Sequence, residues 1–101
     1  MLPSIKPYII GETAFHHQGD KDFLRNLVDA AAELQLDAIK FHLLFDINNY
    51  FVASHPAISA VNEWIFSKEQ YADFFKYANE KKLDVIALCN DPASIQWINN
   101  E

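Results

Sequence analysis

The chain of 101 residues is poor in several residue types, and each scarcity excludes a class of protein. A single cysteine, Cys89, excludes an internal disulfide and a zinc site built on thiolates. With two glycines and four prolines, no segment has the composition of a linker or a low-complexity tract. No apolar run is long enough to cross a bilayer, and no basic segment followed by an apolar one marks a secretory signal. We therefore expect one cytoplasmic domain over residues 1–101, without a membrane partner.

Basic residues are also scarce. Eight Lys and Arg stand against fourteen Asp and Glu, which gives a formal net charge of −6. The basic residues are scattered, whereas nucleic-acid binding needs a basic stripe or patch. We expect no nucleic-acid partner, and the acidic balance indicates mainly that the chain stays in solution.

Three short apolar segments have the character of strands of a sheet. They cover residues 7–12, 37–44 and 83–89 and contain several β-branched residues. In the second segment alternation separates Ile39, Phe41 and Leu43, which should face helices, from Ala38, Lys40 and His42 on the other face. A lysine in mid-strand predicts that this other face lines a polar cavity.

Helical patterns separate these strands. Over residues 20–35, Asp20 can cap a helix whose apolar face includes Phe23 and Leu34, and residues 67–82 begin with a capping box made by Ser67 and Gln70. Residues 45–66 form a long excursion with a short helix over 57–64. After the third strand, Asp91 should cap a last helix with Pro92 in its first position.

Strands that alternate with helices predict parallel pairing through right-handed crossovers. A doubly wound sheet and a (β/α)8 barrel both use this order, but no glycine-rich phosphate turn follows the first strand, which weakens the first alternative. We predict an α/β fold that comprises the first three β/α units of a TIM barrel, with the helices over 20–35 and 67–82 on one side of the sheet. A complete barrel needs about 250 residues, so this would be an incomplete barrel.

Active groups of parallel α/β folds collect at the carboxyl ends of strands, and polar residues follow all three strands. Each group also has a structural interpretation: Glu12 and Lys40 can form an ion pair, the His16–His17 pair can be a solvated loop, and Cys89 can be a small buried hydrophobic residue. The aromatic pairs Phe74/Phe75 and Trp64/Phe66 are expected in the core. The candidates are Glu12, His16, His17, Lys40, His42, Cys89, Asn90 and Asp91.

Two motifs carry a resemblance to a known family. Residues 8–20, Tyr-Ile-Ile-Gly-Glu-Thr-Ala-Phe-His-His-Gln-Gly-Asp, resemble the N-terminal motif of the N-acetylneuraminate (sialic acid) synthase family, an apolar residue followed by I-A-E-I-G-x-N-H-N-G-D. Residues 37–42, Asp-Ala-Ile-Lys-Phe-His, are similar to the D-A-V-K-F-Q of the same family. The resemblance extends over nearly the whole chain and implies the N-terminal part of the family's TIM-barrel domain.

The resemblance implies a transferase of carbohydrate biosynthesis, which condenses phosphoenolpyruvate with an N-acylated amino sugar such as N-acetylmannosamine. It implies catalytic positions at Glu12 and His17, and substrate-binding positions at Lys40, beside the phosphoenolpyruvate anion, and His42, beside the sugar. A divalent metal, manganese, is implied as cofactor, with ligands outside this chain and none within it. The remainder of a barrel, or further copies of this chain, is the expected protein partner, and we expect the isolated chain not to catalyse the reaction.

Three departures from the family pattern open an alternative. His16 and His42 stand where the family has Asn and Gln, and Ala87-Leu88-Cys89-Asn90-Asp91 replaces Ser-Thr-Pro-Phe-Asp. The lost hydroxyls would face the phosphate, and a leucine cannot donate a hydrogen bond to it. The alternative is a non-catalytic, barrel-derived domain that binds a sugar or a partner.

Overall fold

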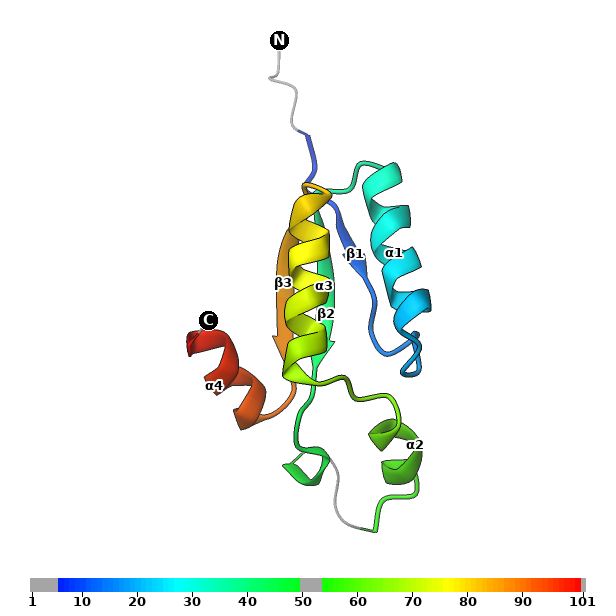
Figure 1. The fold of residues 1–101 in the computed structure, drawn as a ribbon, viewed down its shortest axis with the longest axis vertical. Helices are drawn as coiled ribbons and strands as arrows, with labels where there is room; N and C mark the ends of the chain where they lie inside the picture. Colours follow the sequence, from blue (N-terminus) through cyan, green and yellow to red (C-terminus); the bar gives the residue numbers. More distant parts are fainter. Residues whose placement is uncertain (1–5, 50–53, 101) are drawn as a thin grey trace.

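The computed structural model describes residues 6–49 and 54–100. Three strands form one parallel sheet in the order β1-β2-β3, which confirms the predicted pairing. The elements, shown in Figure 1, are β1 (Ile10–Glu12), α1 (Lys21–Glu33), β2 (Ala38–Leu43), η1 (Ile47–Asn49), α2 (Ile58–Asn62), α3 (Lys68–Glu80), β3 (Asp84–Cys89) and α4 (Pro92–Asn100). This mixed α/β arrangement is consistent with part of an α/β barrel.

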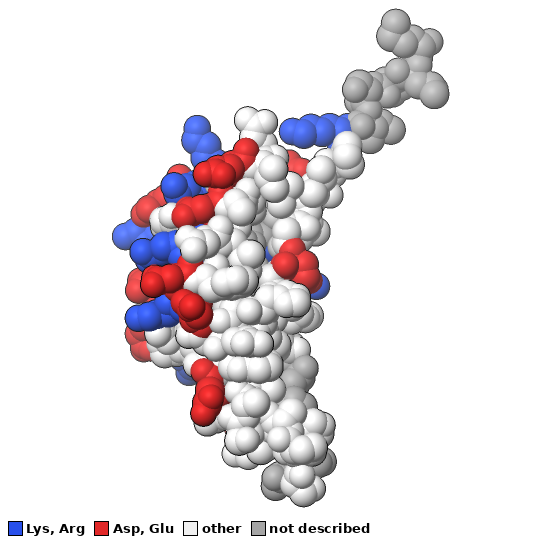
Figure 2. Space-filling view, turned by 90° about the vertical axis from the view of Figure 1, so that its right-hand side faces the viewer, with Lys and Arg blue, Asp and Glu red and all other residues white. Residues whose placement is uncertain are grey.

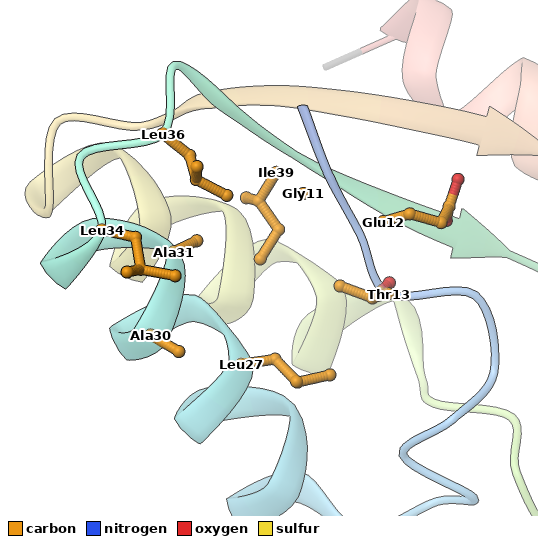
Figure 3. Close-up of a pocket in the computed structure, with 9 residues that line it drawn as sticks. All are labelled: Gly11, Glu12, Thr13, Leu27, Ala30, Ala31, Leu34, Leu36 and Ile39. Atoms are coloured by element: carbon orange, nitrogen blue, oxygen red, sulfur yellow. The ribbon is translucent and has the colours of Figure 1, made fainter. Parts of the chain in front are cut away.

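Helices α1 and α3 cover the same face of the sheet, as predicted (Figures 1 and 3). Ile39, Phe41 and Leu43 of β2 point into this layer and are at most 1% exposed. They belong to a core that includes Leu24 from α1 and Tyr71 from α3. The burial of β2 residues on the helix side therefore fixes which residues lie on the other face, because side chains alternate along a strand.

The predicted helix caps are present. Asp20 accepts hydrogen bonds from the backbone N–H groups of Asp22 and Phe23, and Ser67 and Gln70 form a complete capping box. Pro92 is the first residue of α4, where its missing N–H costs nothing. The sequence predicted these caps correctly because a capping hydrogen bond joins residues that are close together in the sequence.

The predicted apolar faces were partly wrong. Phe23 and Leu34 are 44% and 73% exposed, so neither belongs to the buried face of α1. The first strand begins at Ile10 instead of Pro7, and Ile9 and Ile10 are 47% and 45% exposed where a buried strand was expected. Ile10 lies on the face of the edge strand β1 that is turned away from the helices, and this face has no cover among the described residues, whereas Ile9 lies before the strand.

Charged side chains gather on one side of the molecule. Figure 2 shows Lys, Arg, Asp and Glu concentrated along the side of the helix layer, whereas the rest of that view carries few of them. Charged side chains of the two helices also meet each other: Lys81, after α3, lies near Asp29 of α1 and over the ring of Tyr77, whose hydroxyl donates to Asp29. The charged side is thus the outer, solvent-facing side of the helices.

Candidate functional site

The strand register brings three of the predicted residues together on the face of the sheet opposite to α1 and α3. Glu12 ends β1 and lies opposite Lys40 of β2, and His42 follows two residues further along the same face. Glu12 is 28 residues from Lys40 and 30 residues from His42 in the sequence. The parallel pairing of β1 with β2 therefore creates this Glu12–Lys40–His42 cluster.

The carboxylate of Glu12 is the centre of the cluster. Its Oε2 lies 3.3 Å from Nζ of Lys40, and its Oε1 lies 2.6 Å from Nε2 of His42. The backbone N–H of Ala14 donates a third hydrogen bond to Oε1 at 2.9 Å. Partial desolvation acts to raise the pKa of Glu12, but the Ala14 N–H, His42 and Lys40 outweigh it and hold that pKa below its ordinary value. Glu12 is therefore a carboxylate at neutral pH, and the predicted ion pair with Lys40 is present.

A tight loop after β1 places the next candidates. Thr13 is buried, and its hydroxyl donates to the carbonyl oxygen of Lys40 at 2.7 Å. Gly19 ends the loop with a φ of +81°, and a Cβ there would lie 2.5 Å from the carbonyl oxygen of Glu63. Glycine is thus required by the close approach of the excursion between β2 and α3.

The two histidines of this loop have different environments. His16 is exposed, as expected of a loop, but His17 is only 3% exposed, so the solvated-loop interpretation is wrong for His17. Its ring packs 4.6 Å from the ring of Phe66 and 6.0 Å from that of Phe15. The sequence could not show this, because Phe66 comes from the far end of the long excursion.

Burial also fixes the chemistry of His17. Desolvation, and then the proximity of His16 and His42, lower the pKa of His17 to about 4, so the ring is neutral at pH 7. The N–H of Gly19 donates to Nδ1 at 2.9 Å. A neutral imidazole that accepts at Nδ1 carries its proton on Nε2, which makes His17 a hydrogen-bond donor at that atom. Phe15 connects His17 with the Glu12–Lys40–His42 cluster, since its ring also contacts that of His42 at 5.6 Å.

The residues after β3 do not join the cluster. Asp91 is 3% exposed and accepts hydrogen bonds from the backbone N–H groups of Phe45 at 2.8 Å and Asp46 at 2.5 Å. Asn90 donates through its backbone and side chain to the carbonyl oxygen of Leu43. Cys89 packs against the core, in agreement with its structural interpretation. Asn90 and Asp91, which follow β3, therefore fix the position of the segment that follows β2.

The role of Asp91 in this loop was not predicted beyond its helix cap. The cap itself is present, since Oδ1 accepts from the backbone N–H of Ser94 at 3.0 Å. Desolvation acts to raise the pKa of Asp91, but hydrogen bonds from Ser94, Asp46 and Phe45 outweigh it and lower the pKa. The Asp-Pro pair signals the cap in the sequence, whereas the two loop contacts depend on tertiary structure.

A small cavity of about 160 Å³ lies on the helix side of β1. It is bordered mostly by apolar residues, and Figure 3 shows the side chain of Glu12 directed away from Leu27 and Ala30 of α1. Lys40 and His42 do not line this cavity. The cluster is instead on the uncovered face of the sheet, where the side chains of Glu12, Lys40 and His42 are 47%, 30% and 17% exposed.

Metal ligands are not assembled in the described part of the chain. Within residues 6–49 and 54–100, no group of three or more His, Cys, Asp or Glu is arranged to hold a metal ion. Glu12 and His42 supply only two such side chains, and they bind each other. No step through a metal can be derived from these residues.

No helix within residues 6–49 and 54–100 is long and apolar enough to cross a membrane.

Comparison with known proteins gives a consistent result. No protein-family profile and no curated protein matches the chain. A solved structure of N-acetylneuraminic acid (sialic acid) synthetase from Leptospira borgpetersenii serovar Hardjo-bovis, in complex with citrate, is similar over 92% of this chain with a TM-score of 0.84 and 22% identity. The spore coat polysaccharide biosynthesis protein SpsE from Bacillus subtilis is similar over 92% of the chain with a TM-score of 0.68 and 26% identity.

The structural likeness predicted from the two motifs is confirmed. The chain spans only 32% of the synthetase chain and 26% of the SpsE chain. The likeness therefore covers only part of a sugar-biosynthesis synthase-like fold. It does not assign substrates or catalysis to this chain.

Proposed function

We propose that this chain forms the first part of a barrel enzyme of carbohydrate biosynthesis, which condenses phosphoenolpyruvate with an N-acylated amino sugar such as N-acetylmannosamine. The observation that carries the proposal is the Glu12–Lys40–His42 cluster on one face of a parallel sheet, centred on the carboxylate that ends β1 and extending along β2 toward its carboxyl end. Ligands of parallel α/β folds bind at this end. The similarity to a sialic acid synthetase supports the same substrate class.

Each residue of the proposed site has a role that its environment permits. Lys40 offers a point charge to the phosphate or carboxylate of phosphoenolpyruvate. Glu12 holds Lys40 and His42 in position, and His42 contacts the sugar. Glu12 and His17 are the proposed catalytic residues, with neutral His17 donating a hydrogen bond from Nε2 to an oxygen of the reacting molecule.

The site needs protein that these residues do not supply. The manganese ion implied by the sequence resemblance requires ligands from further β/α units, since the described residues assemble none. We propose that such units, or further copies of this chain, cover the face that carries Lys40 and exclude water from it. Removing water strengthens the interaction of Lys40 with an anion. A cytoplasmic location remains part of the proposal.

One observation favours a second candidate function. Leu88 of β3 lies opposite His42 in the register and is 38% exposed on the cluster face. The sequence resemblance implies a hydroxyl at this position beside the phosphate, and a leucine side chain cannot donate a hydrogen bond to it. A non-catalytic domain that binds a sugar or a partner is therefore the alternative.

The two functions differ in their dependence on phosphoenolpyruvate. Calorimetric titration of the protein with phosphoenolpyruvate should show binding that Lys40→Met abolishes and Lys76→Met, at an exposed position of α3, leaves unchanged. Condensation with N-acetylmannosamine and manganese should appear only when the complementary barrel units are added. Binding of the sugar without any binding of phosphoenolpyruvate would support the alternative, and phosphoenolpyruvate binding that survives Lys40→Met would contradict the proposed site.

A further inference from the structure

A second hollow lies at the opposite end of the sheet, where the chain enters the strands. It has a volume of about 450 Å³, which falls in the range of small-molecule sites. Three segments meet there: the residues before β1, the turn from α1 to β2, and the turn from α3 to β3 (Figure 1). The lining residues are Lys6, Ala32, Gln35, Leu36, Lys81, Lys82 and Leu83.

The charge of this lysine hollow is of one sign. It contains three of the eight basic residues of a chain whose net charge is −6, and no acidic side chain lines it within residues 6–49 and 54–100. The carboxylates next to the two turns are engaged by neutral donors: Asp37 accepts from the N–H of Ile9 at 2.8 Å, and Asp84 from the hydroxyl of Tyr8 at 2.6 Å.

Lys81 forms an ion pair with Asp29, but the contact is weak. Its Nζ lies 3.9 Å from Asp29, and both side chains are more than a third exposed. Exposed ion pairs of this kind contribute little to stability. Positive charge therefore remains available to a ligand in the hollow.

Two of the lining residues follow helix ends in a left-handed backbone conformation. Gln35 and Lys82 have φ values of 58° and 66°, in the left-handed region that follows many helices and that glycine adopts without cost. This chain instead places a polar side chain at both positions, and both side chains line the hollow. Strained positions of this kind are a reason to look for a function.

The negative end of a helix dipole explains only part of the lysine distribution. Lys81 and Lys82 follow α3, where a positive charge is favourable. Lys6 belongs to the segment before β1, however, and comes to the same place through the fold. A helix-end role would also make Lys82 stabilising, which can be measured.

We propose that the lysine hollow binds a small anion with two or more negative charges, such as a diphosphate or a polycarboxylate. Ammonium groups bind such ligands as point charges, and the three exposed lysines border an open hollow large enough for one. The hollow lies at the opposite ends of the strands from the Glu12–Lys40–His42 cluster, so this inference does not depend on the proposed function.

Titration of the protein with inorganic pyrophosphate and, separately, with citrate tests the proposal by calorimetry and by amide chemical shifts. Binding should shift the amide signals of Gln35, Lys82 and Leu83. Lys82→Gly should weaken binding by about fivefold to tenfold, while the melting temperature without ligand stays equal or rises because glycine removes the backbone strain. Lys76→Gln, which removes the same charge from an exposed position of α3, should leave binding unchanged.

The outcomes separate the ligand classes. Binding of pyrophosphate alone indicates phosphate recognition, citrate alone indicates carboxylates, and binding of both indicates selection by charge. Absence of binding by both, or unchanged binding in Lys82→Gly, would overturn the proposal. So would loss of pyrophosphate binding in Lys40→Met, because the anion would then occupy the cluster at the other end of the sheet.

Discussion

At the scale of the residue, the loop after β1 decides the geometry of the candidate site. It carries Glu12 at its start, buries His17 against Phe66, and ends at Gly19 under the carbonyl group of Glu63. Two ring contacts of Phe15, to His17 and His42, connect the loop to the cluster. The environment of His17 therefore depends on how closely this loop approaches the excursion that follows β2.

Gly19→Ala should show how strict this approach is. A Cβ at Gly19 would lie 2.5 Å from a backbone oxygen at a φ of +81°, and neither the backbone nor the clash can be relieved cheaply. We expect a loss of about 2 to 4 kcal/mol in the free energy of unfolding, measured by urea denaturation. Gly11→Ala is the matched control, because the closest atom to its Cβ would be the flexible end of Leu36 at 3.1 Å, and the backbone oxygen of Ala38 would lie at an ordinary contact distance of 3.7 Å. Equal stability of the two variants would contradict the structure of this loop.

The neutral state of His17 should make stability depend on pH. The pKa of His17 is lowered from 6.5 to about 4 in the folded chain, so below pH 6.5 the unfolded chain binds a proton that the folded chain does not. This contribution is complete above pH 6.5 and is lost as the pH falls toward 4. Thermal unfolding between pH 7 and about pH 5, above the range in which Glu12 and Asp91 protonate, should show this loss.

His17→Gln should remove this pH dependence, and His16→Gln, at the exposed neighbour, should keep it. Nitrogen NMR of the imidazole should show a proton on Nε2 at pH 7. A ring that titrates near 6.5, or a proton on Nδ1, would show that His17 is not held as described.

At the scale of the element, the helices begin where local signals place them, but their connections depend on distant contacts. The first turn of α4 is held by Asp91, and the same carboxylate accepts from the chain that leaves β2. One side chain thus joins two connections at the carboxyl end of the sheet. This arrangement positions residues 45 and 46 beside the strand that carries Lys40 and His42.

Asp91→Ala should cost about 2 to 4 kcal/mol of unfolding free energy, because it removes a helix cap and leaves two loop N–H groups without their acceptor. Amide hydrogen exchange at Phe45 and Asp46 should become faster than the loss of global stability explains. Asp73→Ala, at an exposed carboxylate of α3, should change neither quantity. Unchanged exchange at Phe45 and Asp46 in Asp91→Ala would show that the carboxylate does not hold this loop.

At the scale of the whole molecule, the described residues cover the sheet on one face only. The other face carries the charged cluster together with exposed apolar residues, including Ile10 and Leu88, which are 45% and 38% exposed. The outer edges of β1 and β3 have no strand partner among the described residues. Unpaired edges beside an apolar face favour association.

We expect the isolated chain to self-associate in a concentration-dependent manner, as measured by sedimentation. Leu88→Lys should reduce association, because it places a charge on the uncovered face. Leu34→Lys, at the end of α1 and away from that face, should not. A chain that remains monomeric at high concentration and turns over phosphoenolpyruvate with N-acetylmannosamine would contradict both the need for a partner and the predicted inactivity of the isolated chain.

The sequence by itself determined the order and type of the main elements, because each is encoded by neighbours. Alternation separated the helix-facing Ile39, Phe41 and Leu43 from Lys40 and His42, and the caps at Asp20, Ser67 and Asp91 marked three helix starts. The two motifs also identified Glu12, Lys40 and His42 as candidates, although they did not test what these residues do.

Tertiary structure alone decided the rest. Parallel pairing put Glu12 within reach of both Lys40 and His42. The approach of Phe66 made His17 neutral and buried, and the lack of cover over one face of β1 left Ile10 exposed where burial was expected. These properties arise between residues far apart in the chain, and a pattern of neighbours carries no measure of how closely distant segments approach.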